Sequence, residues 1–568
     1  MASLYKKTIS GKPYWYLRTM ARVDGKPKMV SERYLGTGAD IEALLDAREA
    51  AISPARTRHL GFGDTAAAWG MFARLDVAGI IDRVVGPRRS DAGASVGTYL
   101  VLAALNRLVA PCSKSGFADW WASTAADRFT GIPVSALDHR RFWDAMHSIS
   151  IEQLARCEER IAVAMITEFD LDISGLALDM TNFATYIDST NDHAPIAQRG
   201  RAKQKRADLR LVGLGMVVTR DAGIPLVSHA YPGNRPDVTQ FATMIDLLTA
   251  RHAQLATDAG TPAPAEVTVV FDAGQNSTAN FEHLTRSGLS FVGSIPPSDC
   301  PDLLTRPATA RSIVDADRFG GLTAVESRRT VLGTDRRVIL THSPTLHQAQ
   351  AAGFTQTLSK ATAKLDELAT TLARGRTRRT TTAITTAMAA ITHDPWVRRV
   401  IRTHLTGDTP ATHRLTVSTD EPARTRLETE QFGKRVLVTN HDRWPIAEVV
   451  AAYRSQSQVE SAFRQLKDPH VVSFSPMHHW TEHNIRVHTF TCVLALQIAG
   501  LMTRQAHQNG LHMSLPDLLH HLAGIQETVL IYPSTGGRPK ARRMLTETTQ
   551  QQDQLAEIFN LTPWAPKS

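Results

Sequence analysis

This sequence of 568 residues contains little cysteine and no long uninterrupted apolar run. Its four cysteines lie far apart and form no CxxC pair, which argues against a disulfide framework and against a structural zinc site. The first residues contain no apolar segment of the kind that secretion signals need. The longest apolar stretch, residues 490–502, is too short and too interrupted to span a bilayer. We therefore expect a cytoplasmic protein with no membrane partner.

The charge balance is basic, with 64 Lys and Arg residues against 55 Asp and Glu residues and a formal net charge of +9. A basic excess on a large chain favours a polyanionic partner, and nucleic acid is the commonest one. The chain is also too long for one compact core and suggests roughly three or four structural units. Together these features predict a multidomain protein that binds DNA and associates with the nucleoid.

The pattern of residue types changes along the first half of the chain. Short aromatic and β-branched runs broken by Gly predict strands in residues 1–38. Apolar residues at helical spacing then predict helices over residues 64–169. Beyond residue 170 the pattern predicts strands again, at 176–179, 211–219, 224–231, 267–271 and 289–295. This order predicts an α/β core that follows a helical N-terminal region.

In the second half, a stretch rich in Ala, Thr and Arg breaks the rhythm of strands, and we interpret it as a domain inserted into the core. One long helix is predicted from about 445 to 466, and the polar tail beyond about 535 is expected to be loosely ordered. The predicted parts are a small strand-rich region (1–60), a helical DNA-binding region (61–169), a first part of the core (170–296), the inserted domain (297–443), a second part of the core (444–510) and a C-terminal region (511–568).

Two carboxylates stand out by their context. Asp179 and Asp272 each end a short apolar strand, and strands of one sheet can bring two such ends together. Ligand sets made only of carboxylates suit Mg²⁺ or Mn²⁺, which are hard cations that prefer oxygen. In phosphoryl transfer, two such ions activate the attacking oxygen and stabilise the leaving one. A strand-terminal Asp is also a common turn or cap residue, so neither position identifies a site alone.

A third carboxylate lies on the predicted helix near residue 460. Tyr453, Glu460 and Lys467 are spaced by seven residues, so two helical turns bring them back to nearly the same face, with Gln456 and Phe463 close to it. A stripe of Tyr, Glu and Lys is an unusual mixture for a core face. It is explained if the helix borders an active site, with Glu for metal and with Lys and Tyr for DNA phosphates.

These residues give the sequence a recognisable signature. It resembles the bacterial insertion-sequence transposases with a DDE core, and in one large group of these the last carboxylate lies in a Tyr-x2-Arg-x3-Glu-x6-Lys motif. Tyr453, Glu460 and Lys467 match that spacing, whereas Gln456 stands at the Arg position. Residues 458–467 also match a branch of the group with a Gln-Val-Glu-x-x-Phe-Arg-x-Leu-Lys segment.

The resemblance extends over most of the chain. Residues 178–181 (LDMT) are similar to the segment of the first catalytic Asp, and residues 271–274 (FDAG) to that of the second. The resemblance implies a ribonuclease-H-like α/β core with a mixed sheet, a helical N-terminal region and an inserted strand-rich domain before the last catalytic helix. It also implies that Asp179, Asp272 and Glu460 are the catalytic residues and hold two Mg²⁺ or Mn²⁺ ions.

The implied substrate is DNA, both the terminal inverted repeats of an insertion element and the target. Cut-and-paste transposition is expected, in which hydrolysis exposes a 3′-hydroxyl that then attacks target DNA. Because two ends must be held together, a homodimer is expected. DNA contacts are expected from the last catalytic helix and from a basic cluster after the first catalytic strand: Tyr453, Gln456, Arg464, Lys467, Arg201, Lys205 and Arg206.

Two alternatives remain open from the sequence. One is a related nuclease, or a decayed transposase, that cuts DNA without strand transfer. The other is a DNA-binding regulator in which the acidic residues are structural. The histidines at 478, 479, 483 and 488 do not follow a zinc pattern, so a structural metal is not expected there. Trp444 and Trp480 could stack on an unpaired base, although a packed aromatic is the commoner role.

Overall fold

The computed structural model divides the chain into two compact units, residues 1–148 with 502–568 and residues 149–501. The predicted C-terminal region 511–568 lies in the first unit with residues 1–148, and the predicted core part 170–296 lies in the second. The predicted regions 61–169 and 444–510 are each divided between the two units, at residues 148 and 501. The structure describes residues 2–23, 25–87, 93–201, 208–258, 266–376, 378–533 and 540–567.

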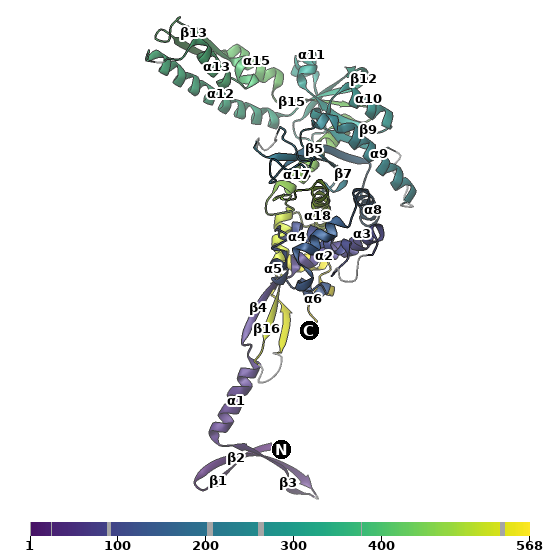
Figure 1. The fold of residues 1–568 in the computed structure, drawn as a ribbon, viewed down its shortest axis with the longest axis vertical. Helices are drawn as coiled ribbons and strands as arrows, with labels where there is room; N and C mark the ends of the chain where they lie inside the picture. The colour runs from purple at the N-terminus through teal and green to yellow at the C-terminus, as the bar shows by residue number, and fades with distance from the viewer. Residues whose placement is uncertain are drawn as a thin grey trace. The chain divides into compact units, whose positions relative to one another are not determined.

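The larger unit is built on a nine-stranded mixed sheet with the order β10-β11-β12-β15-β9-β8-β5-β6-β7 (Figure 1). Three neighbouring strands, β5, β8 and β9, run parallel, and all other pairs are antiparallel. The strands are β5 (Gly175–Thr185), β6 (Arg210–Thr219), β7 (Pro225–Pro232), β8 (Thr268–Phe271), β9 (Ser290–Ile295), β10 (Ser312–Ile313), β11 (Thr323–Val331), β12 (Thr334–His342) and β15 (Lys434–Thr439). A mixed α/β fold with a large mixed sheet is thereby confirmed, and it is consistent with a ribonuclease-H-like fold.

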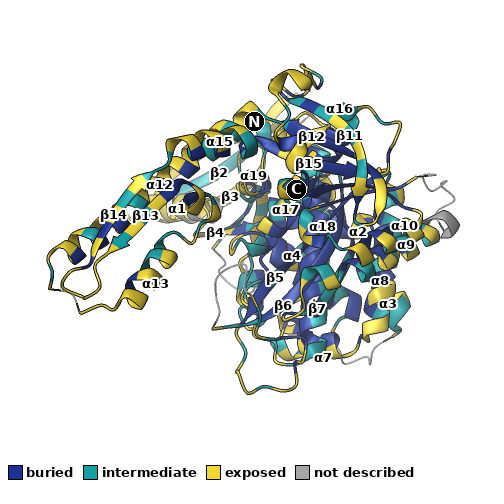
Figure 2. Ribbon diagram, turned by 90° about the horizontal axis from the view of Figure 1, so that it is seen from above, coloured by how far each residue is buried: buried dark blue, intermediate teal, exposed yellow. Residues whose placement is uncertain are grey.

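The central strands are buried on both faces, as parallel strands usually are (Figure 2). Every residue of β8 and β9 is buried. Helices α8 (Ile151–Phe169), α9 (Phe241–Asp258) and α10 (Thr278–Ser287) belong to this unit. Their ends follow from the sequence, because a capping box of Ser150 and Gln153 begins α8, while Ser277 caps the start of α10 and Gly288 in the left-handed region ends it.

The stretch 297–443, predicted as one inserted domain, contributes to two different structures. Its strands β10, β11, β12 and β15 extend the main sheet, because β12 pairs with β15 and β15 pairs with the core strand β9. Between β12 and β15 the chain is mostly helical, with one hairpin, and has its own apolar cluster around Leu365 and Phe432. This part contains α12 (Pro344–Ala373), α13 (Thr381–Ile391), α14 (Pro395–Val400), β13 (Ile401–Thr406), β14 (Arg414–Thr419) and α15 (Glu421–Gln431). Because β12 and β15 both belong to the main sheet, only the chain between them, from α12 to α15, stands apart from it. That segment is mostly helical, whereas a strand-rich insertion was predicted.

The smaller unit joins the two ends of the chain. Strand β4 (Arg56–Gly61) pairs with β16 (Gln526–Ile531), which also pairs with β17 (Ala541–Leu545). The expectation of a loosely ordered tail beyond 535 is wrong for its described part, which forms β17, α20 (Gln550–Ile558) and a short 3-10 turn. This polar segment is ordered because β17 pairs with the edge of β16 and a capping box of Thr549 and Gln552 stabilises the start of α20.

The rest of the smaller unit is helical or belongs to an N-terminal sheet. The helices are α2 (Gly63–Arg74), α3 (Val77–Val85), α4 (Val96–Val109), α5 (Phe117–Ala122), α6 (Ala126–Thr130), α7 (His139–His147) and α19 (Leu515–Ala523). Residues 2–36 form an antiparallel sheet of β1 (Ala2–Ile9), β2 (Lys12–Val23) and β3 (Lys26–Gly36), followed by α1 (Gly38–Ile52). Strands in the first 38 residues and helices after residue 64 are thus confirmed.

A buried carboxylate holds the terminal sheet to the helices. The side chain of Glu527 on β16 has no exposed surface, and it forms ion pairs with Arg128 of α6 and Arg543 of β17. Changing Glu527 to Gln is expected to lower the free energy of unfolding of this unit by about 3 kcal/mol, because both guanidinium groups lose their counter-charge in a buried setting. Urea denaturation measures this. The matched control is Arg83→Ala, which removes an exposed pair with Asp76 and should cost less than about 1 kcal/mol.

Of the helices in the described ranges, α18 (Glu482–Gln508) has the length and hydropathy that a membrane span would need. Its most apolar window is 94% buried inside the protein. Burial against other protein segments is what a core helix shows, so this helix gives little support to a membrane location.

Candidate active site

The pairing of two parallel strands brings the first two predicted carboxylates side by side. Ala177 of β5 pairs with Val270 of β8, so counting two residues along each strand places Asp179 beside Asp272 on the same face of the sheet. Asp179 does not end its strand as predicted, because β5 continues to Thr185 through antiparallel pairing with β6. Asp272 directly follows the last residue of β8, Phe271. The short apolar run before Asp179 covers only the first part of a longer strand that is buried along most of its length.

Two local hydrogen bonds orient the Asp272 carboxylate. Its Oδ1 accepts a bond of 2.7 Å from the backbone N–H of Ala273 and one of 2.9 Å from the hydroxyl of Ser294 on β9. The side chain is otherwise exposed. A carboxylate that is held in place and still open to solvent can accept a ligand without first losing a buried partner.

The predicted long helix that carries the third carboxylate is divided into α16 (Ile446–Arg454) and α17 (Gln456–Lys467). At Ser455 the backbone N–H bonds the carbonyl three residues back, at Ala452, and the N–H of Gln458 bonds Ser455 in the same way. Such 3-10 turns contain fewer residues per turn than an α-helix. The prediction of one uninterrupted helix from about 445 to 466 is therefore wrong: Tyr453 lies on α16, whereas Glu460 and Lys467 share α17.

Helix α17 is attached to β5 at both of its ends. The buried side chain of Gln456 donates through Nε2 to the carbonyl of Leu178, next to Asp179, at 3.1 Å. At the other end, Nζ of Lys467 donates to the hydroxyl of Thr181 at 2.6 Å. The helix that carries Glu460 is thereby held along the strand that carries Asp179.

Gln456 therefore acts as a positioning residue in the candidate site. Changing Gln456 to Leu keeps the volume but removes the bond to the Leu178 carbonyl, and we expect DNA cleavage to slow by about 10- to 100-fold. The half-saturating Mn²⁺ concentration should rise together with this loss, which a purely structural role would not produce. The control is Gln465→Leu on the same helix, which should leave both quantities unchanged. Equal effects of the two variants would contradict the role.

A cleft of about 600 Å³ joins two of the three carboxylates to a group of cations. Asp272 and Glu460 line it together with Lys434, Arg435 and Arg454, whereas Asp179 is not among the lining residues. Carboxylates and cations thus line one cleft, which suits a phosphate group and a divalent cation bound together. The sequence did not predict these cations, because Lys434 and Arg435 come to the cleft through the pairing of β15 with β9, which leaves no spacing signal, while Arg454 ends α16.

Tyr453 lines the same cleft and is almost fully buried. Burial, and then the charges of Asp272 and Glu460, raise the pKa of its hydroxyl above the ordinary value near 10, and a hydrogen bond with Ser294 and the charge of Arg435 oppose this only in part. The hydroxyl therefore keeps its proton at neutral pH. It is suited to donate a hydrogen bond to a phosphate oxygen and unsuited to act as a nucleophile.

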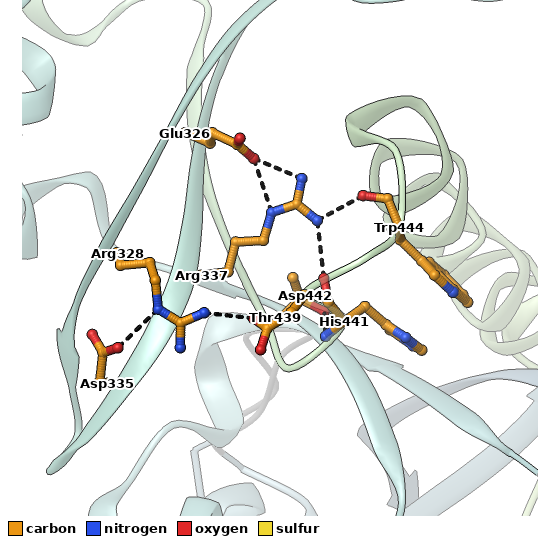
Figure 3. Close-up of polar contacts among 8 residues, drawn as sticks. All are labelled: Glu326, Arg328, Asp335, Arg337, Thr439, His441, Asp442 and Trp444. Atoms are coloured by element: carbon orange, nitrogen blue, oxygen red, sulfur yellow. Dashed lines mark hydrogen bonds and ion pairs between the residues drawn. The ribbon is translucent and has the colours of Figure 1, made fainter.

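A network of arginines fixes the loop that leads from β15 into α16 (Figure 3). Arg337 of β12 is paired with Glu326 and donates to the carbonyls of His441 and Trp444 at 2.9 and 2.6 Å. Arg328 of β11 bridges Asp335 and Asp442 in the same way. These contacts set where α16 begins, and so place Tyr453 and Arg454 at the cleft.

The other predicted site residues lie in different settings. Arg464 is exposed on α17, and Arg201 is exposed with its carbonyl bonded to Asn182 of β5. Lys205 and Arg206 lie outside the described residues. DNA contacts of these residues stay predictions.

The histidine and tryptophan positions singled out in the sequence are largely accounted for by packing. His488 is buried and its Nε2 lies 2.9 Å from the carbonyl of Phe474. Trp444 stacks on the His441 ring at 3.6 Å. Trp480 is 58% exposed and makes an edge contact with His193.

Asp179, Asp272 and Glu460 are the candidate ligands for Mg²⁺ or Mn²⁺. Among the described residues, no three His, Cys, Asp or Glu side chains stand together as a preformed metal site. Asp179, Asp272 and Glu460 nevertheless supply only carboxylate oxygen, the ligand type that these ions prefer. Mg²⁺ is usually held by one or two carboxylates with substrate phosphates and water rather than by a complete protein cage. The residues present fit ions that bind together with DNA.

Comparison with known proteins identifies the family of the chain. The family model described as "Transposase DDE domain" matches residues 174–498, which is more than half of the chain, and the chain therefore belongs to this family. Membership supports a transposase and a nuclease of the DDE class. No curated protein matches the sequence. Among solved structures, the chain is similar to a piggyBac transposase in a synaptic complex with hairpin DNA, with 9% sequence identity, 83% of this chain and 82% of that chain covered, and a TM-score of 0.36.

Proposed function

We propose that this protein is a transposase that binds the terminal inverted repeats of its own insertion element, cuts the DNA there and joins the ends to target DNA by a cut-and-paste route. The observation that carries the proposal is the convergence of Asp272 and Glu460 in one cationic cleft, with Asp179 in register beside Asp272 on the adjacent strand. Membership in the transposase DDE domain family supports the reaction class.

The side chains of the cleft divide into two roles. Arg435 and Arg454 bind the phosphates on either side of the cleaved bond, since exposed cations in a cleft attract and orient the DNA backbone. Lys434 is buried and donates through Nζ to the carbonyl of Leu304, so it adds positive charge behind the cleft wall. The protonated Tyr453 donates to a non-bridging phosphate oxygen. Both contacts orient the phosphorus for in-line attack by water, and later by the freed 3′-hydroxyl.

Asp179, Asp272 and Glu460 would hold two Mg²⁺ or Mn²⁺ ions. Bound there, such ions supply activation of the attacking oxygen and neutralisation of the leaving one. Gln456 and Lys467 keep α17, and with it Glu460, against β5. Water and then the freed 3′-hydroxyl are the attacking groups, so no covalent link between protein and DNA is proposed.

Transposition requires two element ends in one complex, and a homodimer acting on chromosomal DNA in the cytoplasm is part of the proposal. The test is incubation of the full chain with labelled element-end duplex, target plasmid and Mn²⁺, followed by separation of cut and joined products. Joined product supports the transposase. Cleavage without joining favours a nuclease or decayed transposase, and DNA binding without nicking favours a regulator.

A further inference from the structure

The first 36 residues carry most of the net charge of the protein. They contain eight Lys and Arg residues against Asp24 and Glu32, which gives +6, while the whole chain carries +9. These residues form the sheet of β1, β2 and β3. The cations are Lys6, Lys7, Lys12, Arg18, Arg22, Lys26, Lys28 and Arg33.

The sheet exposes side chains that a sheet normally buries. Every residue of β1 is exposed, as are nine of the eleven residues of β3. Eight large apolar or aromatic side chains are exposed in this short segment: Leu4, Tyr5, Ile9, Met20, Val23, Met29, Val30 and Tyr34. Small sheets need a hydrophobic face packed on something for independent stability. Such an exposed surface marks a binding site.

One face of the sheet combines tyrosines with cations. The strand register pairs Tyr5 with Tyr16 and Tyr16 with Tyr34, and it pairs Lys7 with Tyr14, so these side chains share a face. The rings of Tyr14 and Tyr16 lie 6.1 and 5.2 Å from that of Tyr34. Lys12 and Arg18 lie on this tyrosine face by the same register.

Both hairpin ends add positive charge to the sheet. The first turn, at Ser10 and Gly11, has both residues at positive φ, the geometry of a tight hairpin, and Lys7 and Lys12 flank it. Near the end of the second hairpin stand Arg22, Lys26 and Lys28, all of which are exposed. The two turns lie at opposite ends of β2, so cations stand at both ends of the sheet, where a long, negatively charged partner would meet both groups.

We infer that the β1–β3 sheet is a duplex-DNA-binding module, with its cations on backbone phosphates and its tyrosine face against the DNA. The major groove of B-form DNA admits a two-stranded β-ribbon, which one hairpin of this sheet can supply. A second copy of the same sheet is a poor occupant, because it would bring +6 against +6. The inference rests on the proposed function for the identity of the DNA. It adds a DNA-binding segment that precedes the predicted helical DNA-binding region 61–169 in the chain.

The test uses the full chain and a fluorescently labelled mixed-sequence duplex of about 30 base pairs, roughly three helical turns. The triple variant Arg22→Ala, Lys26→Ala, Lys28→Ala should bind this duplex about ten-fold more weakly. The slope of log affinity against log salt should also fall by about 2 to 3, because each phosphate contact contributes about 0.9. A second variant at the other hairpin, Lys7→Ala with Lys12→Ala, should lower the slope by roughly 2.

The matched control removes three exposed cations elsewhere, Arg286, Lys360 and Lys364, and should leave affinity and slope close to those of the unchanged protein. Equal losses in the control and the hairpin variants would overturn the inference, since net charge alone would then explain binding. Unchanged DNA affinity in both hairpin variants would overturn it too, and a simultaneous loss of self-association would identify a second copy as the occupant.

Failure of this inference can be separated from failure of the proposed function. Cleavage of element-end DNA by the unchanged protein, measured in the same preparation, tests the function. If cleavage occurs and the hairpin variants bind DNA normally, only the sheet assignment is wrong. If the unchanged protein neither binds nor cuts DNA, both are wrong.

Discussion

Changing Asp272 to Asn is expected to lower the rate of DNA cleavage by about a thousand-fold or more, with little change in the affinity for element-end DNA. The substitution keeps the shape of the side chain, and the amide oxygen can still accept the bonds from Ala273 and Ser294. What it removes is the negative charge that a cation in the cleft requires. Because the exposed cations Arg435 and Arg454 are untouched, the DNA should stay bound.

The same outcome is expected for Asp179→Asn and Glu460→Gln, measured by single-turnover cleavage and by fluorescence anisotropy. A matched control is Asp366→Asn, which changes an exposed carboxylate on α12 and should cleave at the unchanged rate. Cleavage within about ten-fold of the unchanged protein by any of the three site variants would show that this carboxylate is dispensable.

Changing Asp272 to Cys should make cleavage depend on the identity of the divalent cation. A thiolate is a poor ligand for Mg²⁺ and a better one for softer cations. We therefore expect the cleavage rate of the variant in Mg²⁺ to be about a thousand-fold below that of the unchanged protein. In Mn²⁺ its cleavage rate should be at least about ten-fold higher than in Mg²⁺. Single-turnover cleavage at equal concentrations of the two ions measures the change.

The unchanged protein supplies the baseline ratio of Mn²⁺ to Mg²⁺ activity, and Asp366→Cys serves as a thiol control away from the cleft. Chelation by EDTA should stop cleavage by the unchanged protein while DNA remains bound. Cleavage that continues in EDTA, or the same ion preference in the cysteine variant and the unchanged protein, would remove Asp272 from the metal ligands.

The core strands were predictable because their residues are buried on both faces. The apolar runs before Asp272 and after Gly288 gave β8 and β9 almost to the residue. The apolar run before Asp179 predicts a strand end there, whereas β5 continues as a buried antiparallel strand to Thr185, in which polar Thr181, Asn182 and Thr185 interrupt the apolar pattern. Apolar patterning reports burial, and it does not report where hydrogen-bonded pairing stops.

Long-range pairing explains what the sequence could not predict. Lys434 and Arg435 reach the cleft only because β15 lies between β12 and β9, and nothing near residue 434 indicates these neighbours. The same pairing moves the strands of the predicted insertion into the main sheet. The tightened turn at Ser455 also escaped prediction, since serine is compatible with an uninterrupted helix.

Asp179, Asp272 and Glu460 are proposed to act together on DNA. An experimental structure of the protein with element-end duplex and Mn²⁺, in which anomalous scattering locates the ions, tests this. We expect two ions about 3.5–4 Å apart, each within roughly 2.2 Å of a carboxylate oxygen of these residues and of the scissile phosphate. Ions bound elsewhere, or an Asp179 carboxylate that stays away from both ions, would contradict it.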